Sequence, residues 1–520
     1  MPPQQVSAER VTVRGESRQW RLAALVTPAL AITALAAGQS YALMNDGGMT
    51  PLEWVALALL AVNLAWVSSA AATAIAGTIV LLMPRAGGRV SAPFSTASLT
   101  AIVFPIRNEQ PGRVMGGAQA AHDELTKVRA DEHFEIFFLS DTADPGIARE
   151  EEAAFRRLRE SRPGGRFFYR RRTVIHGRKP GNIADFVRRW GGRYDYMVVF
   201  DADSLMSAEA LQRLVQRMDA SPRTALIQTL PVIVSAQTLF ARTQQFAMRA
   251  YGQIFGAGLA WWSAGAGNFW GHNAIIRVRA FAAHAGLPVL QGKGPLGGEI
   301  LSHDFIEAAL LRRAGWRVEI APDITGSYEE CPPTLISMAQ RDRRWAQGNL
   351  QHLRLLFARG LDPVSRVHFL AGVMGYMSAP FWFALVVAST GLGWLQDPAA
   401  DTGQASGGLF LMTTLIVLSP KWLALLLWAG GRLPGWPRHP RFIAGLVIET
   451  AVSAFTAPIL MVNQTAAVFS AAFGCDAGWH PQVRNCDGPT SQDVGQHYAL
   501  HLIVGLALCA AALAHDAGLT

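Results

Sequence analysis

The chain has 520 residues, of which 50% are hydrophobic and only 16% are charged, and its formal net charge is +8. Soluble domains carry roughly a quarter charged residues, so this composition excludes an ordinary soluble protein. The basic residues do not gather with aromatic residues in a known binding motif, so the positive charge does not indicate a nucleic-acid-binding protein.

The chain begins with a basic segment, residues 1–20, and continues with two apolar stretches within residues 21–83. Each stretch is long enough to cross a bilayer, which takes about 20 apolar residues, and neither precedes a convincing signal-peptide cleavage site. Four arginines precede the first stretch, and Arg85 and Arg89 follow the second. Because basic residues accumulate on cytoplasmic loops, we expect the N-terminal segment and residues 84–366 to be cytoplasmic.

The polar block 84–366 alternates apolar strand patterns with helical patterns. Strands are predicted at 98–106 (SLTAIVFPI), 134–140 (FEIFFLS) and 196–200 (YMVVF), and a helix is predicted at 181–190 (GNIADFVRRW). This order predicts an α/β domain with parallel strands, and ligands of such domains bind beyond the carboxyl ends of the strands.

Three successive strand ends carry polar groups: 107–109 (RNE), Asp141 and Asp201. Their convergence predicts a nucleotide site. Neither a P-loop motif nor a dinucleotide-binding GxGxxG motif is present, so the sequence favours neither a P-loop ATPase nor a dinucleotide dehydrogenase. A diphosphate bound without those loops needs a metal held by carboxylates.

Asp201 and Asp203 fit that need. In an extended segment the two carboxylates reach one side while Ala202 faces the other, and magnesium typically takes one or two protein carboxylates together with phosphate oxygens. The alternative is that one of the two aspartates caps the helix that follows, a role that Ser204 or Ser207 could also fill.

Asp304 lies at the start of a predicted helix in the segment GGEILSHDFIEAALLRRAGW. One interpretation is a capping box, because Glu307 follows three residues later. The other is that Asp304 or His303 is a general base that takes a proton from an attacking hydroxyl.

The segment 340–352 (QRDRRWAQGNLQH) leads toward the next apolar stretch. Guanidinium groups at Arg341, Arg343 and Arg344 suit a diphosphate, and the indole of Trp345 suits the apolar face of a sugar. An amphipathic helix on the membrane surface would use the same residue types.

Residues 367–472 contain further apolar stretches, followed by a loop at 473–497 and a last span at 498–520. Residues 442–473 can form one tilted span or a pair broken at Pro458. Lys421 and Glu449 lie within apolar stretches, where charges usually pair or face a polar cavity. They either line a path for a polar product or pair with each other to hold two helices together.

The order of these motifs resembles a processive family 2 glycosyltransferase of the cellulose-synthase type, which implies a GT-A fold for residues 84–366. The strings GGEILSHDFIEAALLRRAGW, GSYEECPP and RDRRWAQGNLQH more narrowly resemble the glucans biosynthesis glucosyltransferase H family. In the acceptor-site segment NFWGHNAIIR, His272 stands where a Ser is usual. In the segment resembling QxxRW, Arg341 stands at the Gln position, which leaves the role of that residue open.

The resemblance implies a role for each matching residue. It makes Asp304 the catalytic base, and Mg²⁺ or Mn²⁺ the metal on Asp201 and Asp203. It places the nucleotide sugar at Asp141, Arg178, Lys179, Asn182, Asp201 and Arg344. It places the acceptor at Trp345, Trp270, Gly271 and His272. Trp261, Trp262 and Trp270 could all stack on glucan, but core packing is the expected role for these three.

The implied reaction is an inverting transfer of glucose from UDP-glucose to a β-1,2-linked glucan, which the flanking spans pass toward the periplasm. The implied location is the bacterial inner membrane, with membrane lipid, the glucan acceptor and a periplasmic glucan-processing protein as partners and no nucleic acid. Trp479 and Arg484, in the loop 473–497, resemble a gating loop that closes over the nucleotide. A cytoplasmic position for that loop would require the break at Pro458.

Two other functions remain open from the sequence. A synthase of another β-glucan, such as cellulose, would show the same donor-site residues. A polysaccharide-export or sensing protein could keep the fold without catalysis, although a binding protein has no need for a base at Asp304.

Overall fold

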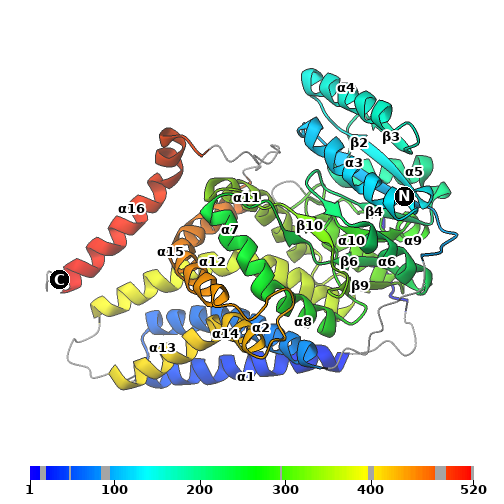
Figure 1. Ribbon diagram of the computed structural model, residues 1–520. Helices are drawn as coiled ribbons and strands as arrows, with labels where there is room; N and C mark the ends of the chain where they lie inside the picture. Colours follow the sequence, from blue (N-terminus) through cyan, green and yellow to red (C-terminus); the bar gives the residue numbers. More distant parts are fainter. Residues whose placement is uncertain are drawn as a thin grey trace.

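The computed structural model describes residues 1–11, 19–45, 48–83, 94–292, 296–395, 403–474 and 488–516. In the sequence, an α/β domain lies between two groups of long apolar helices. In the structure these helices gather on one side of the domain (Figure 1). The expected fold class, an α/β domain inserted between transmembrane helices, is confirmed. The apolar helices are α1 (Gln19–Met44), α2 (Pro51–Leu82), α12 (Pro363–Leu395), α13 (Gly403–Val417), α14 (Ser419–Ala429), α15 (Arg441–Ala472) and α16 (Ser491–Asp516).

A seven-stranded sheet in the order β3-β2-β1-β4-β8-β6-β9 forms the centre of the domain. Strand β1 pairs in parallel with β2 and β4, as the strand-helix alternation predicts, whereas β8 runs antiparallel to β4 and β6. The strands are β1 (Thr100–Ile106), β2 (Phe134–Ser140), β3 (Phe167–Arg171), β4 (Tyr196–Val199), β6 (Thr224–Thr229), β8 (Ala274–Arg277) and β9 (Arg317–Ala321). The predicted strands therefore agree with β1, β2 and β4 to within two residues.

Helices cover both faces of the sheet because successive strand residues point to opposite sides. Ile102 and Phe104 of β1 belong to one hydrophobic core, while Ala101 and Val103 belong to the other. The first core packs against α3 (Pro111–Lys127), α4 (Pro145–Ser161) and α6 (Ala208–Asp219), and the second packs against α5 (Arg178–Trp190), α9 (Val278–His284) and α10 (His303–Arg313).

A small second sheet, in the order β5-β10-β7, sits at the carboxyl edge of the large one. Its strands are β5 (Leu205–Met206), β7 (Val232–Ile233) and β10 (Ser327–Glu329). The chain then continues from β7 into α7 (Leu239–Ala247), the π-helical turn η3 (Met248–Gly252) and α8 (Gln253–Ser263). Later in the chain, β10 is followed by α11 (Leu335–Leu350) and the short helix η4 (Gln351–Arg354).

Helix α8 belongs to the polar block in sequence but packs along α2 among the apolar helices. Glycines permit this contact: a Cβ at Gly258 would lie 2.0 Å from the carbonyl oxygen of Thr73, and one at Gly77 would lie 1.9 Å from that of Ile254. The backbones of the two helices therefore touch, as they do in membrane helix pairs that use small residues. The contact fixes the domain to the second apolar helix.

Replacing Gly258 with Ala is expected to destabilise the protein by roughly 1–3 kcal/mol, because a methyl group would force two backbones apart. Thermal unfolding of the detergent-purified protein would measure this as a lower Tm. The matched control is Gly38→Ala in α1, where a Cβ would meet nothing within 4 Å. Equal melting temperatures for the two variants would refute the close contact between α2 and α8.

Five helices in the described residues are long and apolar enough to cross a membrane: α1, α2, α12, α15 and α16. A sixth candidate is the pair α13 and α14, which is bent by 61° at its break. Of the two alternatives for residues 442–473, the structure agrees with one continuous helix, α15, and the break at Pro458 is wrong because that proline lies inside the helix. A proline removes only one helical hydrogen bond, and the packing of both halves of α15 compensates for that loss.

Both ends of α15 contact the α/β domain. Near its start, Glu449 accepts a hydrogen bond from the Tyr251 hydroxyl at 3.0 Å, and near its end Ser470 accepts one from Arg343 at 2.8 Å. The residues just before the loop 473–497 therefore lie beside the domain without a break in the helix. The candidate gating residues Trp479 and Arg484 lie outside the described residues, and α16 begins at Ser491, inside the loop expected at 473–497.

The two charges expected within apolar helices pair with each other. The Lys421 ammonium of α14 lies 2.6 Å from Glu449 Oε2 of α15, and the other oxygen of Glu449 accepts hydrogen bonds from Tyr251 and Ser453. The Glu449 side chain is only 3% exposed. The structure thus supports the second of the two interpretations, a pair that holds α14, α15 and η3 together.

Candidate active site

A cavity of about 1080 Å³ opens at the carboxyl ends of β1, β2 and β4 and extends to the apolar helices. Ten of the twelve residues expected at the site line it: Asp141, Arg178, Lys179, Asn182, Asp201, Trp270, His272, Asp304, Arg344 and Trp345. Gly271 and Asp203 are not among the lining residues, but each is a chain neighbour of residues that are. The cavity therefore gathers segments from Pro105 to Gln464, which are far apart in the sequence.

The segment after β4 forms a turn where an extended strand was expected. The strand ends at Val199, and the Ser204 amide donates to the Asp201 carbonyl oxygen at 3.1 Å. The expected extended conformation is therefore wrong, and Ala202 lines the cavity together with Asp201. The pairing of Asp201 and Asp203 on one cation stays a prediction. The capping alternative is also wrong for both aspartates, because Ser207 caps α6 by accepting from the Ala210 amide.

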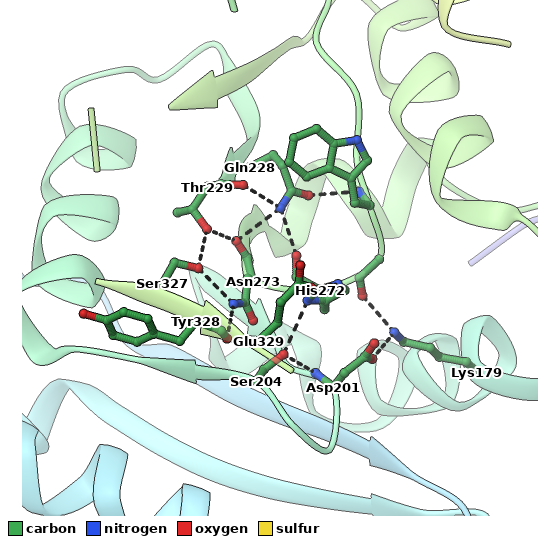
Figure 2. Close-up of polar contacts among 12 residues, drawn as sticks. Lys179, Asp201, Ser204, Gln228, Thr229, His272, Asn273, Ser327, Tyr328 and Glu329 are labelled. Atoms are coloured by element: carbon green, nitrogen blue, oxygen red, sulfur yellow. Dashed lines mark hydrogen bonds and ion pairs between the residues drawn. The ribbon is translucent and has the colours of Figure 1, made fainter. Parts of the chain in front are cut away.

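Lys179, in the first turn of α5, joins Asp201 to the segment that carries Gly271. Its ammonium forms an ion pair with Asp201 and donates to the Gly271 carbonyl oxygen at 2.9 Å (Figure 2). Burial opposes the charge on Lys179, but the carboxylates of Asp201 and Asp304 outweigh burial and raise the pKa of Lys179 above its ordinary value. These contacts therefore favour the charged form of Lys179, which lines the cavity.

Gly271 brings the backbone against Asp304. It adopts a left-handed conformation with φ +87°, and a Cβ there would lie 2.8 Å from both carboxylate oxygens of Asp304. Only glycine allows this approach without strain. The acceptor-site segment and the candidate base are thus held in direct contact.

Asp304 does not cap its helix. The N-cap of α10 is Ser302, which makes no capping hydrogen bond, and Asp304 lies in the first turn with its side chain 23% exposed to the cavity. His303 Nδ1 lies 3.0 Å from Asp304 Oδ1 and 3.2 Å from Glu307 Oε1. The capping-box interpretation is wrong, because Glu307 turns to His303 and away from the backbone.

Asp141 makes a bidentate ion pair that was not anticipated from the sequence. Arg172 binds both of its carboxylate oxygens, the first at 2.6 Å from Nε, and also donates to the carbonyl oxygens of His176 and Arg178. Both side chains are less than a tenth exposed. Arg172 therefore fixes the loop before α5 against the end of β2, and the run RRRTVIHGRKPGN contained it without marking it out from its neighbours.

His272 is held between two elements at the rim of the cavity. Its Nε2 lies 3.3 Å from the Glu329 carboxylate of β10, and its Nδ1 lies 3.4 Å from the Ser204 hydroxyl (Figure 2). The neighbouring Asn273 donates to the Ser327 hydroxyl and to the Tyr328 carbonyl oxygen. The unusual histidine in the acceptor-site segment therefore has a structural partner, Glu329, which no motif in the sequence indicated.

Gln228, at the end of β6, fixes the backbone of the acceptor-site segment. Its side-chain oxygen accepts from the Trp270 amide at 2.9 Å, and its amide donates to the His272 carbonyl oxygen at 3.0 Å (Figure 2). Gln228 is fully buried. A buried amide that satisfies its neighbours in this way makes the loop rigid.

Helix α11 closes one wall of the cavity. Arg344 and Trp345 face the cavity, and the Arg341 guanidinium lies 4.3 Å from the centre of the Trp345 ring, which is a cation–π contact. Burial lowers the pKa of Arg344, with a further contribution from Arg341, but an arginine remains charged at neutral pH. Asp342 accepts from Gln464 of α15, so the helix is joined to the apolar helices as well.

The tryptophans expected at the acceptor site divide into two groups. Trp270 and Trp345 line the cavity, and Trp345 is 49% exposed. Trp262 stacks on His368 in a buried cluster, and Trp261 packs edge-on against Trp20. Core packing is therefore the observed role of Trp261 and Trp262.

Two groups of side chains have donor atoms suited to a metal. The first is formed by Glu329, Asp203 and Asp201. Burial raises the pKa of Glu329, the charges of Asp203 and Asp201 add to this effect, and His272 and Arg341 oppose it. This accumulation of carboxylates fits a hard cation, although Lys179 already neutralises part of it. The second group is His303, Asp304 and Glu307, whose candidate ligand atoms all lie within 4.8 Å of one another.

Comparison with known proteins gives consistent matches over the whole domain. Residues 102–284 match the family model described as glycosyl transferase family 2, and residues 196–433 match glycosyl transferase family group 2. The chain is 43% identical to glucans biosynthesis glucosyltransferase H of Vibrio cholerae over 96% of this chain and 71% of that protein. It is 44% identical to the protein of the same name from Rhodopseudomonas palustris over 95% and 72%.

A solved structure with a similar chain path is that of the mannosyltransferase PcManGT from Pyrobaculum calidifontis, in complex with GDP-Man and Mn²⁺. The two sequences are 16% identical, and the match covers 78% of this chain and 99% of the mannosyltransferase chain with a TM-score of 0.46.

Proposed function

Because the chain belongs to the glucans biosynthesis glucosyltransferase H family, within glycosyltransferase family 2, we propose that it transfers glucose from UDP-glucose to a β-1,2-linked glucan. The membership makes the chain a glycosyltransferase with a GT-A fold. The donor, the linkage and the destination of the product belong to the proposal.

The observation that carries the proposal is the convergence of Asp304, Asp201 and Lys179 in one cavity. A partly exposed carboxylate with no helix-capping role lies beside a cation and beside a glycine that brings the backbone within contact distance. A binding protein needs no such carboxylate, whereas a transferase needs a base that faces the acceptor hydroxyl.

In the proposed reaction Asp304 takes the proton of the acceptor hydroxyl as that oxygen attacks the anomeric carbon of glucose. Attack from the face opposite UDP inverts the configuration in one displacement. Arg344 and Lys179 stabilise the negative charge that develops on the departing diphosphate. Trp345 and Trp270 stack on the sugar rings, because an indole face complements the apolar face of glucose.

We assign the nucleotide to the half of the cavity formed by β2 and α5. Asp141, oriented by Arg172, contacts the uracil side, while Arg178 and Asn182 lie next to the nucleotide. A divalent cation, Mg²⁺ or Mn²⁺, held by Asp201 and Asp203 would neutralise diphosphate charge. Gly271 and His272 complete the acceptor side.

The cavity supports a route for the product toward the membrane. Its lining includes Gly372 and Tyr376 of α12 and Gln464 of α15, so it continues from Asp304 to the apolar helices. We propose that the glucan leaves along these helices, that the domain faces the cytoplasm, and that the protein resides in the bacterial inner membrane. A periplasmic glucan-processing protein would then receive the product.

Membranes containing the protein, supplied with labelled UDP-glucose and Mg²⁺, are expected to form labelled glucan, and linkage analysis should find β-1,2 bonds. A β-1,4 product would favour the cellulose alternative. No incorporation with any labelled nucleotide sugar would favour a non-catalytic export or sensing protein. GDP-glucose in place of UDP-glucose serves as the donor control.

Replacing Asp203 with Asn is expected to raise the Mg²⁺ concentration needed for half-maximal incorporation by roughly tenfold or more, because a hard cation loses a charged oxygen ligand. Chelation should stop incorporation by the unmodified protein, and Mg²⁺ or Mn²⁺ should restore it. Asp131→Asn is the control, because Asp131 precedes β2 at the opposite edge of the sheet. An unchanged Mg²⁺ requirement in Asp203→Asn would contradict the assigned ligand.

A further inference from the structure

We propose that His303 and Glu307 form a proton outlet for Asp304, which carries the acceptor's proton along one face of α10 to a second cavity that adjoins the first. The inference rests on the proposed function, because it concerns the proton that Asp304 removes at each transfer. It assigns a role in proton release to His303 and Glu307, which the proposed reaction does not otherwise use.

The three side chains form a short chain of contacts within the first turns of α10. The single nitrogen Nδ1 of His303 lies 3.0 Å from Asp304 Oδ1 and 3.2 Å from Glu307 Oε1. Exposure falls along this chain, from 23% for Asp304 to 6% for His303 and 2% for Glu307. His303 therefore separates a carboxylate that faces the substrate from one that does not.

The two carboxylates line different cavities. Asp304 and His303 line the large cavity, whereas Glu307 lines a second cavity of about 210 Å³. The N-terminal residue Pro3 and Val289 form part of the second wall, and Val289 is 68% exposed, so this cavity reaches the protein surface. Its volume accommodates several water molecules, each of which takes about 30 Å³ in the liquid.

The surroundings of Glu307 favour the exchange of a proton with water in the second cavity. Its Oε2 is buried and has no hydrogen-bond partner within the described part of the chain. A buried carboxylate oxygen without a partner is costly unless it is protonated or meets water. Burial, reinforced by Asp304 and opposed by His303 and Lys179, raises the pKa of Glu307 above its ordinary value.

The charged groups that face His303 favour its protonated form. Burial lowers the pKa of His303, but Asp304 and Glu307 of its own helix outweigh burial and the opposing charge of Lys179 on α5, so the pKa is raised. Two further titratable groups lie on neighbouring segments. The ring of His352 on η4 faces the Ser302 carbonyl oxygen, and Glu299 lines both cavities. Because His303 Nδ1 lies between the two carboxylates, we assign a transferable proton to this group of three.

The proton balance closes without a co-reactant. At rest Asp304 and Glu307 are ionised and His303 is an imidazolium. Once Asp304 has taken the acceptor proton, His303 passes its Nδ1 proton to Glu307 and receives the proton of Asp304 at the same nitrogen. Glu307 then releases its proton to water in the second cavity. Asp304 becomes a base again while sugar and nucleotide still fill the large cavity.

The test uses the full-length protein in detergent with labelled UDP-glucose, and compares Glu307→Gln and His303→Gln with Glu124→Gln and His122→Gln on α3. We expect kcat to fall about tenfold or more in the first pair, with KM for UDP-glucose within about twofold. The solvent deuterium isotope effect on kcat should rise, because proton release becomes rate-limiting. A merely structural role would leave that isotope effect unchanged.

A second measurement does not depend on glucose transfer. Infrared titration of the unmodified protein should show protonated carboxyls that ionise at a higher pH than an ordinary glutamate, as expected for both Glu307 and Glu329. Glu307→Gln should remove the band that belongs to Glu307, while Glu124→Gln should retain it. Absence of the band, or variants with unchanged kcat and isotope effect, would overturn the outlet. A titrating band in a protein that transfers no glucose would support the proton site and refute the proposed function alone.

Discussion

Replacing Asp304 with Asn is expected to lower glucose incorporation by about 10³-fold, within the range of 10² to 10⁴ that a positioned general base contributes. The amide has the same shape as the carboxylate, so the contact with Gly271 persists. It cannot take a proton, and the loss should therefore fall on kcat while KM for UDP-glucose changes little.

The controls for this variant separate chemistry from folding. Binding of UDP by Asp304→Asn, measured by calorimetry, should match that of the unmodified protein, because Asp304 faces the acceptor in the proposed arrangement. Asp219→Asn is the matched substitution, since Asp219 accepts a hydrogen bond from Tyr196 at the end of α6, away from the cavity lining. Incorporation by Asp304→Asn at an undiminished rate would refute its assignment as the base.

Removing one partner of the Lys421–Glu449 pair should cost about 3–5 kcal/mol of stability, because it leaves a charge buried without compensation. The pair is nearly inaccessible, and Glu449 also accepts from Tyr251 and Ser453. Lys421→Met and Glu449→Gln should each lower the Tm of the detergent-purified protein. The Tm of the double variant Lys421→Met, Glu449→Leu should fall by less than the sum of the decreases in the two single variants.

The exposed pair of Lys127 and Glu124 on α3 is the comparison, since such surface pairs contribute only about 0–1 kcal/mol. If Lys421→Met and Glu449→Gln lower the Tm no more than Lys127→Met does, the buried pair does not hold the helices together. If they melt normally but block release of glucan, the two charges line the product path, as the first interpretation of the sequence held.

Several features of the protein follow from the sequence alone because they depend on local patterns. Apolar runs of strand length located β1, β2 and β4, and apolar runs of bilayer length located the long helices. Polar residues directly after parallel strands must converge at one edge of the sheet, so Asp141 and Asp201 were correctly expected in one cavity. The family followed from three long strings, each specific enough to identify relatives.

The tertiary structure decided the features that depend on contacts between distant segments. Arg172 pairs with Asp141 and Glu329 with His272, and such charges look alike in the sequence until the fold selects their partners. The turn at Asp201 depends on hydrogen bonds with Ser204. The expected extended conformation of residues 201–203 was wrong for this reason.

The helices show the same division between local and distant information. Pro458 predicted a break that the packing of α15 against α11 and α12 overrides, whereas the actual break lies between α13 and α14. The glycines at 77 and 258 looked unremarkable until two helices from separate blocks met there. Local sequence determines which segments are apolar or extended, but only their packing determines which side chains face one another, and that arrangement makes the site.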